Sequence, residues 1–152
     1  ALVTAATERS HTVVGFSAPK EGVYGGQFGG GDSGLTQLTI SPRQRLDDVL
    51  AQTDKIPMGG TDCSLPMRWA LERKLKFDVF VVYTDNETWF GQIHPAQALR
   101  QYREKMGIAA RLIVVAMLAN PFSIADPEDA GMLDIVGFDT ATPAIMADFA
   151  RG

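Results

Sequence analysis

The most apolar stretch of the chain covers residues 77–83 and ends abruptly in a polar segment, within the sequence FDVFVVYTDNET. A run of this length, rich in β-branched and aromatic residues, predicts a strand buried on both faces. The polar residues that follow predict a loop at its carboxyl end. Ligands of open α/β sheets bind at that end of the strands, so Asp85 is the first candidate functional residue.

Shorter apolar runs alternate with amphipathic segments along the rest of the chain. Strands are predicted at residues 12–16, 37–40, 112–118 and 133–137. Helices are predicted at residues 1–8 and 64–74, and helix starts at Ser41, His94, Asp126 and Thr142. This alternation predicts an α/β fold with a doubly wound, mostly parallel sheet covered on both faces.

The first segment of the chain departs from this architecture. A doubly wound sheet normally places an early strand near its centre, whereas this chain opens on an uncapped helical segment. We therefore expect one domain over residues 1–152 that is incomplete at its N-terminus, with its first central strand outside these residues.

Composition narrows the classes of protein. The 152 residues are 45% hydrophobic, and no apolar run is long enough to span a bilayer, so no membrane partner is expected. A single cysteine, Cys63, cannot form an internal disulfide and fits a reducing compartment, for which we expect the cytoplasm. The net charge of −4 gives no bulk positive field that would hold nucleic acid through its phosphates.

Two loops carry oxygen donors toward the same edge of the predicted sheet. The first is residues 59–64 (GGTDCS) and the second is residues 84–87 (TDNE). Hydroxyl and carboxylate oxygens without clustered histidine or thiolate are the ligands that a hard cation such as Mg²⁺ prefers. The residues alone leave a second interpretation open, in which Thr61 or Asp62 caps a helix and Asp85 forms a turn.

The same segments carry a family resemblance. A Gly-Gly-Thr loop together with a strand that ends in Thr-Asp resembles the von Willebrand factor type A domain. The strings PMGGTDCSLPMRWA, DVFVVYTDNETWFGQIHPAQALRQYREKMGIAARLIVVAM and FSIADPEDAGMLDIVGFDT are similar to the type A domain of the Ro ribonucleoprotein autoantigen family (SS-A, TROVE-type), bacterial members included. The resemblance covers about residues 56–140 and implies a Rossmann-like type A fold.

The resemblance also implies a metal-ion-dependent adhesion site that holds Mg²⁺. By position, Thr61 and Asp85 match its threonine and aspartate ligands. Asp62, Asn86 and Glu87 would form the rim on which a partner docks. The remaining ligands belong to an Asp-x-Ser-x-Ser loop that nothing in this chain matches, and they are expected upstream of Ala1.

The function implied by the resemblance is binding without catalysis. In Ro proteins the type A domain closes a ring of helical repeats in the same polypeptide. That ring binds Y RNA and misfolded or maturing non-coding RNA in RNA quality control. An exoribonuclease or another acidic protein is the partner expected to dock at the metal site.

Several alternatives stay open at this point. The same oxygens would suit a metal-dependent hydrolase or phosphotransferase, or a type A adhesion domain unrelated to RNA. Cys63 would be a nucleophile if His94 or His11 served as its base. An acidic segment could be a calcium loop rather than a helix start, and basic side chains could contact RNA. The acidic segment contains Asp126, Glu128 and Asp129, and the basic set is Arg68, Arg73, Lys74, Lys76, Arg100, Arg103, Lys105 and Arg111.

Overall fold

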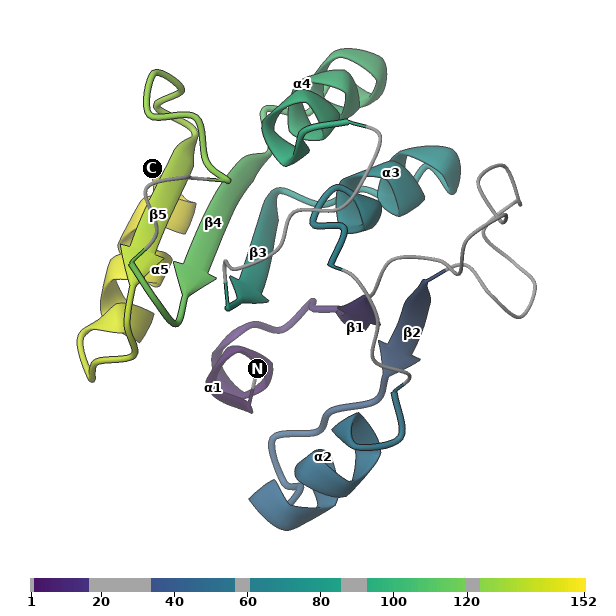
Figure 1. Cartoon of the computed structure of the whole chain (residues 1–152), viewed down its shortest axis with the longest axis vertical. Helices are drawn as coiled ribbons and strands as arrows, with labels where there is room; N and C mark the ends of the chain where they lie inside the picture. Colours follow the sequence, from purple (N-terminus) through teal and green to yellow (C-terminus); the bar gives the residue numbers. More distant parts are fainter. Residues whose placement is uncertain (1, 17–33, 57–60, 86–92, 120–123) are drawn as a thin grey trace. The chain divides into compact units, whose positions relative to one another are not determined.

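The computed structural model describes residues 2–16, 34–56, 61–85, 93–119 and 124–152. They belong to two compact units, Ala1–Gly60 and Thr61–Gly152, which are described separately (Figure 1). No helix in the described part of the chain is long and apolar enough to cross a membrane.

The first unit combines a short antiparallel ladder with two helices. Its elements are α1 (Leu2–Thr7), β1 (Val13–Phe16), β2 (Leu35–Leu38) and α2 (Leu46–Thr53). β1 pairs antiparallel with β2, with Val13 opposite Leu38. A small core of Ala5, Ile40 and Val49 holds α1 and α2 against this ladder. The edge strand expected at residues 37–40 is therefore present and begins two residues earlier.

The second unit contains the parallel sheet that the alternation predicts. Its elements are α3 (Leu65–Glu72), β3 (Val79–Thr84), α4 (Pro95–Met106), β4 (Arg111–Ala116), β5 (Met132–Val136) and α5 (Thr142–Arg151). Among the described residues the sheet has the order β3-β4-β5, and both pairings are parallel. The α/β fold class is thus confirmed. The missing central strand and the single-domain extent stay predictions.

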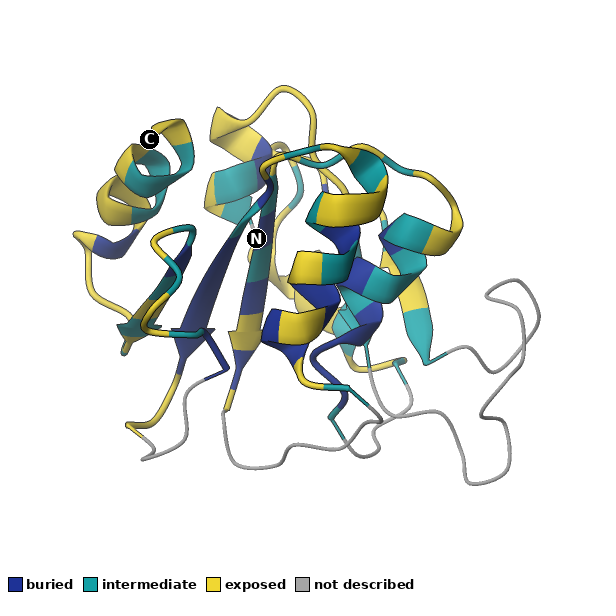
Figure 2. Ribbon diagram, turned by 90° about the horizontal axis from the view of Figure 1, so that it is seen from above, coloured by how far each residue is buried: buried dark blue, intermediate teal, exposed yellow. Residues whose placement is uncertain are grey.

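Helices lie on both faces of this sheet. Phe80 on β3 meets the ring of Tyr102 on α4, with ring centroids 4.9 Å apart. Phe80 is in register with Leu112, so α4 covers the face to which both side chains point. Arg111, one residue earlier on β4, points to the other face and contacts Phe149 on α5. In Figure 2 the buried residues gather on the strands and on the helix sides that face them.

The helix α4 follows its predicted signals closely. It begins at Pro95, directly after His94, whose Nδ1 accepts a hydrogen bond from the amide nitrogen of Ala96 over 3.2 Å. It ends at Met106, and the next residue, Gly107, adopts a left-handed conformation with φ of 66°. Only glycine takes that conformation without strain, so the end of α4 is encoded locally.

Three local predictions are wrong. The first concerns β3, which was predicted to be buried on both faces. Its residues alternate between buried and more exposed, and Tyr83 is 40% exposed. The helix predicted from Ser41 begins at Leu46, since Ser41 instead closes a turn in which its carbonyl accepts from the amide of Gln44. The helix predicted from Asp126 is a turn that leads into β5.

Candidate functional site

The loop before α3 and the carboxyl end of β3 meet at one edge of the sheet. The side chain of Cys63 is hydrogen-bonded to Thr84, the last residue of β3. The charges of Asp62 and Asp85 both act on the same thiol. The structure therefore brings together the two segments that the sequence singled out, within one compact unit.

The environment of Cys63 makes it a poor nucleophile. Its residue is 1% exposed. Burial is the main cause that raises the pKa of the thiol to about 11, with smaller contributions from the carboxylates of Asp62 and Asp85 and an opposing one from the hydrogen bond to Thr84. A thiol with this pKa is protonated at neutral pH, and the thiolate is the reactive form.

The histidines considered as bases for Cys63 have other roles. The Nδ1 of His94 accepts a hydrogen bond from the amide of Ala96 at the start of α4. His11 belongs to the other compact unit, where its Nδ1 lies 2.9 Å from the carbonyl oxygen of Glu8. The geometry of the described residues therefore gives no support to a cysteine–histidine pair.

Asp62 is buried and organises the loop before α3. Its residue is 1% exposed. Its Oδ1 accepts hydrogen bonds from the amide nitrogen of Ser64 over 3.0 Å and from the Ser64 hydroxyl over 2.6 Å. Its Oδ2 lies 3.6 Å from a guanidinium nitrogen of Arg68 and is the buried side-chain oxygen without a hydrogen-bond partner among the described residues.

This arrangement settles two expectations about the loop. α3 follows Ser64, whose side chain makes no capping hydrogen bond, while Asp62 accepts from the amide of Ser64, so the alternative in which Asp62 caps the start of this helix is supported. Asp62 was also expected on an exposed docking rim, and this is wrong for its side chain, because the turn to Ser64 holds the carboxylate inside. Asn86 and Glu87, the other two rim residues, lie outside the described residues.

Thr61 and Asp85 keep the exposure that a binding site requires. Thr61 is half-buried and Asp85 is exposed, each next to a buried residue that anchors it: Asp62 in the loop and Thr84 in the strand. A rigid scaffold thus supports two oxygen-bearing side chains at an accessible edge.

The donor set fits a hard cation in kind and falls short of it in number. A hydroxyl from Thr61 and carboxylates from Asp62 and Asp85 are all oxygen donors, as Mg²⁺ prefers, and one buried carboxylate oxygen is left unsatisfied. Mg²⁺ takes about six ligands. Over the described ranges no three acidic, histidine or cysteine side chains gather into a metal-binding group.

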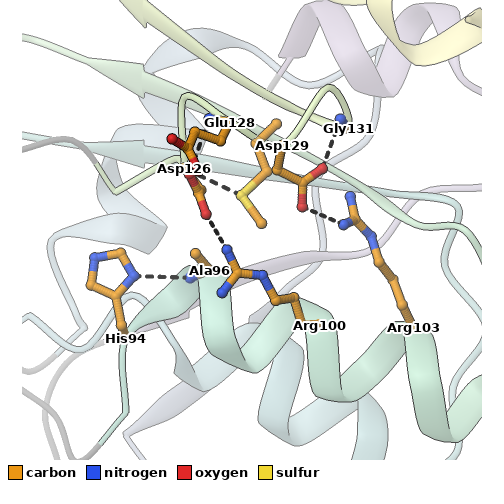
Figure 3. A network of polar contacts seen from close by, with 9 residues as sticks. His94, Ala96, Arg100, Arg103, Asp126, Glu128, Asp129 and Gly131 are labelled. Carbon is orange, nitrogen blue, oxygen red and sulfur yellow. Dashed lines mark hydrogen bonds and ion pairs between the residues drawn. The ribbon is translucent and has the colours of Figure 1, made fainter.

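The acidic segment before β5 serves a structural role (Figure 3). Asp126 pairs with Arg100, and Asp129 pairs with Arg103 at 2.5 Å, both from α4. The other carboxylate oxygens accept backbone amides, that of Glu128 at Asp126 and that of Gly131 at Asp129. These carboxylates are used in turns and ion pairs, so neither the helix start nor a calcium loop describes them.

The sequence analysis included Ser64 and Thr84 in the two loops and Arg68 in the basic set, but it gave none of the three its role at this edge. Ser64 precedes Leu65-Pro66, a serine before a proline in the first turn of a helix, which is a recognisable cap signal. Thr84 is the last strand residue before Asp85. The role of Arg68 had no sequence signal beyond its position four residues after Ser64.

A parallel α/β domain with accessible oxygen donors at the carboxyl edge of its sheet has the architecture of the von Willebrand factor type A class. The family model described as "Ro60 vWA domain" matches residues 1–150, and the chain belongs to this family.

Relatives with known names agree with this membership. The chain is 54% identical over 115 residues to RNA-binding protein RO60 of Deinococcus radiodurans, covering 76% of the chain and 22% of the relative. It is 52% identical over 119 residues to RNA-binding protein RO60 of Caenorhabditis elegans, covering 78% and 18%. The chain therefore matches about a fifth of the length of each relative.

A solved structure shares the fold. The crystal structure of Deinococcus radiodurans RO (RSR) protein superposes with a TM-score of 0.81 at 44% sequence identity. The match covers 99% of this chain and 27% of that one. The fold and the family are thereby established together.

Proposed function

We propose that the chain is the type A module of a Ro-type RNA-binding protein and that it binds a partner through a divalent cation. Thr61 and Asp85 hold Mg²⁺ at the carboxyl edge of the sheet, with further ligands from residues upstream of Ala1. A carboxylate of the partner, an exoribonuclease or another acidic protein, completes the coordination. Asn86 and Glu87 border the docking position.

One observation carries this proposal. The contact between Cys63 and Thr84 fixes the Thr61 loop against the end of β3, from which Asp85 extends. The two donors come from separate loops on one rigid scaffold. This favours a preformed site over one assembled only on binding.

RNA is held mainly by other parts of the protein, in this proposal. The chain has a net charge of −4, which opposes phosphate binding. Two of its basic side chains, Arg100 and Arg103, are already paired with carboxylates. The two relatives, both named RNA-binding protein RO60, are about five times longer than the part that matches this chain. The additional length can hold a ring of helical repeats, which in this proposal binds Y RNA and misfolded or maturing non-coding RNA. In this proposal the protein takes part in RNA quality control in the cytoplasm.

A metal-dependent hydrolase is the competing function, and the site favours it less. Hydrolysis requires a general base within reach of the metal-bound water. Within residues 61–64 and at 84–85 the structure offers a protonated thiol and carboxylates but no histidine or lysine. The proposal is therefore binding without bond cleavage.

Manganese binding tests the metal site, because Mn²⁺ replaces Mg²⁺ and is visible by electron paramagnetic resonance. The measurement uses the protein at its natural length, so that upstream ligands are included. We expect Asp85→Ala and Thr61→Val to weaken Mn²⁺ binding at least tenfold. Asp48→Ala, an exposed acid on α2, is the matched control and should leave binding unchanged. Equal affinity of Asp85→Ala and wild type would show that the metal assignment is wrong.

Deletion tests the division of labour for RNA. We expect the natural-length protein without residues 1–152 to keep most of its affinity for Y RNA in a filter-binding assay, provided that circular dichroism shows it folded. Complete loss of affinity in a folded deletion variant would contradict the proposal.

A further inference from the structure

The carboxylate of Asp62 is more deeply buried than its hydrogen bonds account for. A buried charge normally needs full pairing, because transfer out of water costs several kcal/mol when its lone pairs stay unsatisfied. Oδ1 of Asp62 is satisfied twice by Ser64, whereas Oδ2 has no hydrogen-bond partner within the described residues. The nearest cation, Arg68, is 3.6 Å away and therefore outside hydrogen-bond distance.

Arg68 is poorly placed to neutralise that charge. Its side chain remains 32% exposed on α3, so it keeps part of its hydration and interacts through water as well as through protein. The ion pair is therefore partial, and negative potential remains in the loop. This potential lies directly beside Thr61 in the chain, and it acts on the same thiol as the charge of Asp85.

We infer that Asp62 is a positioning residue of the proposed cation site: Oδ1 fixes the Thr61–Ser64 turn through Ser64, and the unsatisfied Oδ2 supplies a buried negative charge that a cation held by Thr61 and Asp85 stabilises. This inference rests on the proposed function and adds to it a residue that does not itself contact the docking partner. Cation binding and order in the loop are then thermodynamically linked, since each favours the other.

The linkage gives Asp62 a signature that an ordinary structural residue lacks. Asp62→Asn keeps an oxygen that accepts from Ser64 and removes the charge. Without metal, the variant loop should be as well ordered as the wild type or better, because an incompletely paired buried charge has gone and the half-exposed Arg68 is still hydrated. With metal, the variant should bind about tenfold more weakly, the range seen when a group that supports metal ligands is lost.

Arg68→Gln should act in the opposite direction. It removes the positive charge that competes with the cation for Asp62, so Mn²⁺ should bind about twofold more tightly. Without metal its loop should exchange amide hydrogen faster than wild type, because Oδ2 loses its nearest cation. A merely structural ion pair would give the same sign of effect for both variants.

The test combines Mn²⁺ titration with hydrogen exchange of peptides that cover residues 61–72, in the protein at its natural length. Asp129→Asn and Arg103→Gln break another aspartate–arginine pair, away from the loop, and are the matched controls. The inference is supported if Asp62→Asn weakens Mn²⁺ binding without faster metal-free exchange, while the controls bind as wild type does.

Three results overturn it in distinguishable ways. If Asp85→Ala weakens Mn²⁺ binding and Asp62→Asn does not, the role of Asp62 is wrong and the proposed site stands. If Asp62→Asn accelerates exchange in the metal-free protein, the residue is structural. If wild type binds no Mn²⁺, the site and the inference fail together.

Discussion

The Tyr102 hydroxyl accepts a hydrogen bond from the amide nitrogen of Phe77, 2.7 Å away. The same hydroxyl donates to the carbonyl oxygen of Leu75, also at 2.7 Å. Tyr102 is fully buried on α4, and its ring packs edge-on against Phe80. One side chain therefore attaches α4 to the backbone that leads into β3, and so positions the strand that ends beside Asp85.

Removal of that hydroxyl should destabilise the domain. Tyr102→Phe leaves the partly buried amide of Phe77 and carbonyl of Leu75 without their partner, which costs about 1–3 kcal/mol. Urea unfolding followed by tryptophan fluorescence measures the loss. Tyr83→Phe is the control, since Tyr83 is 40% exposed and its substitution should change stability little. Equal losses in the two variants would show that the Tyr102 hydrogen bonds do not stabilise the fold.

Cys63 should resist alkylation while the protein is folded. Its pKa is raised from 9.0 to about 11, so at pH 8 the folded protein holds about a hundredfold less thiolate than the unfolded chain. Iodoacetamide labelling at pH 8, with and without urea, measures the difference. Rapid labelling of the folded protein would contradict the burial of this thiol.

The same shift predicts a loss of stability in alkali. The unfolded chain releases the thiol proton near pH 9 and the folded protein only near pH 11, so folding becomes less favourable as the pH rises through this interval. Cys63→Ala should reduce that dependence when unfolding is measured from pH 8 to pH 11. An unchanged slope would assign the effect to other groups.

Asp129 should stabilise the turn before β5 in a pH-dependent way. The hydrogen bond from Arg103, with a further one from the amide of Gly131, lowers the pKa of Asp129 below its ordinary value of 3.8 despite partial burial (Figure 3). Its contribution is therefore present above about pH 4 and is lost as the pH falls through the lowered pKa. Carboxyl-carbon NMR should show that pKa rising toward its ordinary value in Arg103→Gln. Arg100→Gln should shift the pKa of Asp129 less, because the effect of Arg100 on that pKa is purely electrostatic and is the smallest of its causes.

Arg111 should hold the end of α5 against the sheet. Its guanidinium donates to the carbonyl oxygen of Phe149 and lies 5.4 Å from the centroid of that ring. Arg111→Lys keeps the charge but loses the planar fork, so the last turn of α5 should exchange about tenfold faster. Arg151→Lys, in an exposed pair with Asp148, should have little effect on the same peptides.

Elements whose boundaries depend on short-range signals followed the sequence. α4 begins after His94-Pro95 and ends before Gly107 because the cap, the proline and the left-handed glycine each act within one turn. The predictions at Ser41 and Asp126 used similar signals and were wrong. Both residues also form local turns, and a cap residue favours a helix only where the following residues can bury an apolar face.

The burial of single side chains was the least accessible feature. Aspartate is a residue type that usually lies at the protein surface. Only the fold shows that the carboxylate of Asp62 lies inside, hydrogen-bonded to Ser64. Likewise the alternate burial of β3 depends on which of its faces α4 covers. The sequence pattern shows how apolar a residue is. It does not show which distant segments of the chain will surround that residue in the fold.

The amino-acid sequence by itself determined the α/β class, the succession of strands and helices around β3, and the two loops that carry Thr61 and Asp85. These follow from periodicity and from residue types within a few positions of one another, where the forces are local. Only the tertiary structure decided that Cys63 and Thr84 meet, that Asp62 is enclosed with one oxygen unsatisfied, and that the acids before β5 pair with α4. Each of these depends on packing between segments far apart in the chain, which brings charges and hydrogen-bonding groups together, inside the fold for Cys63 and Asp62 and near its surface for the acids before β5.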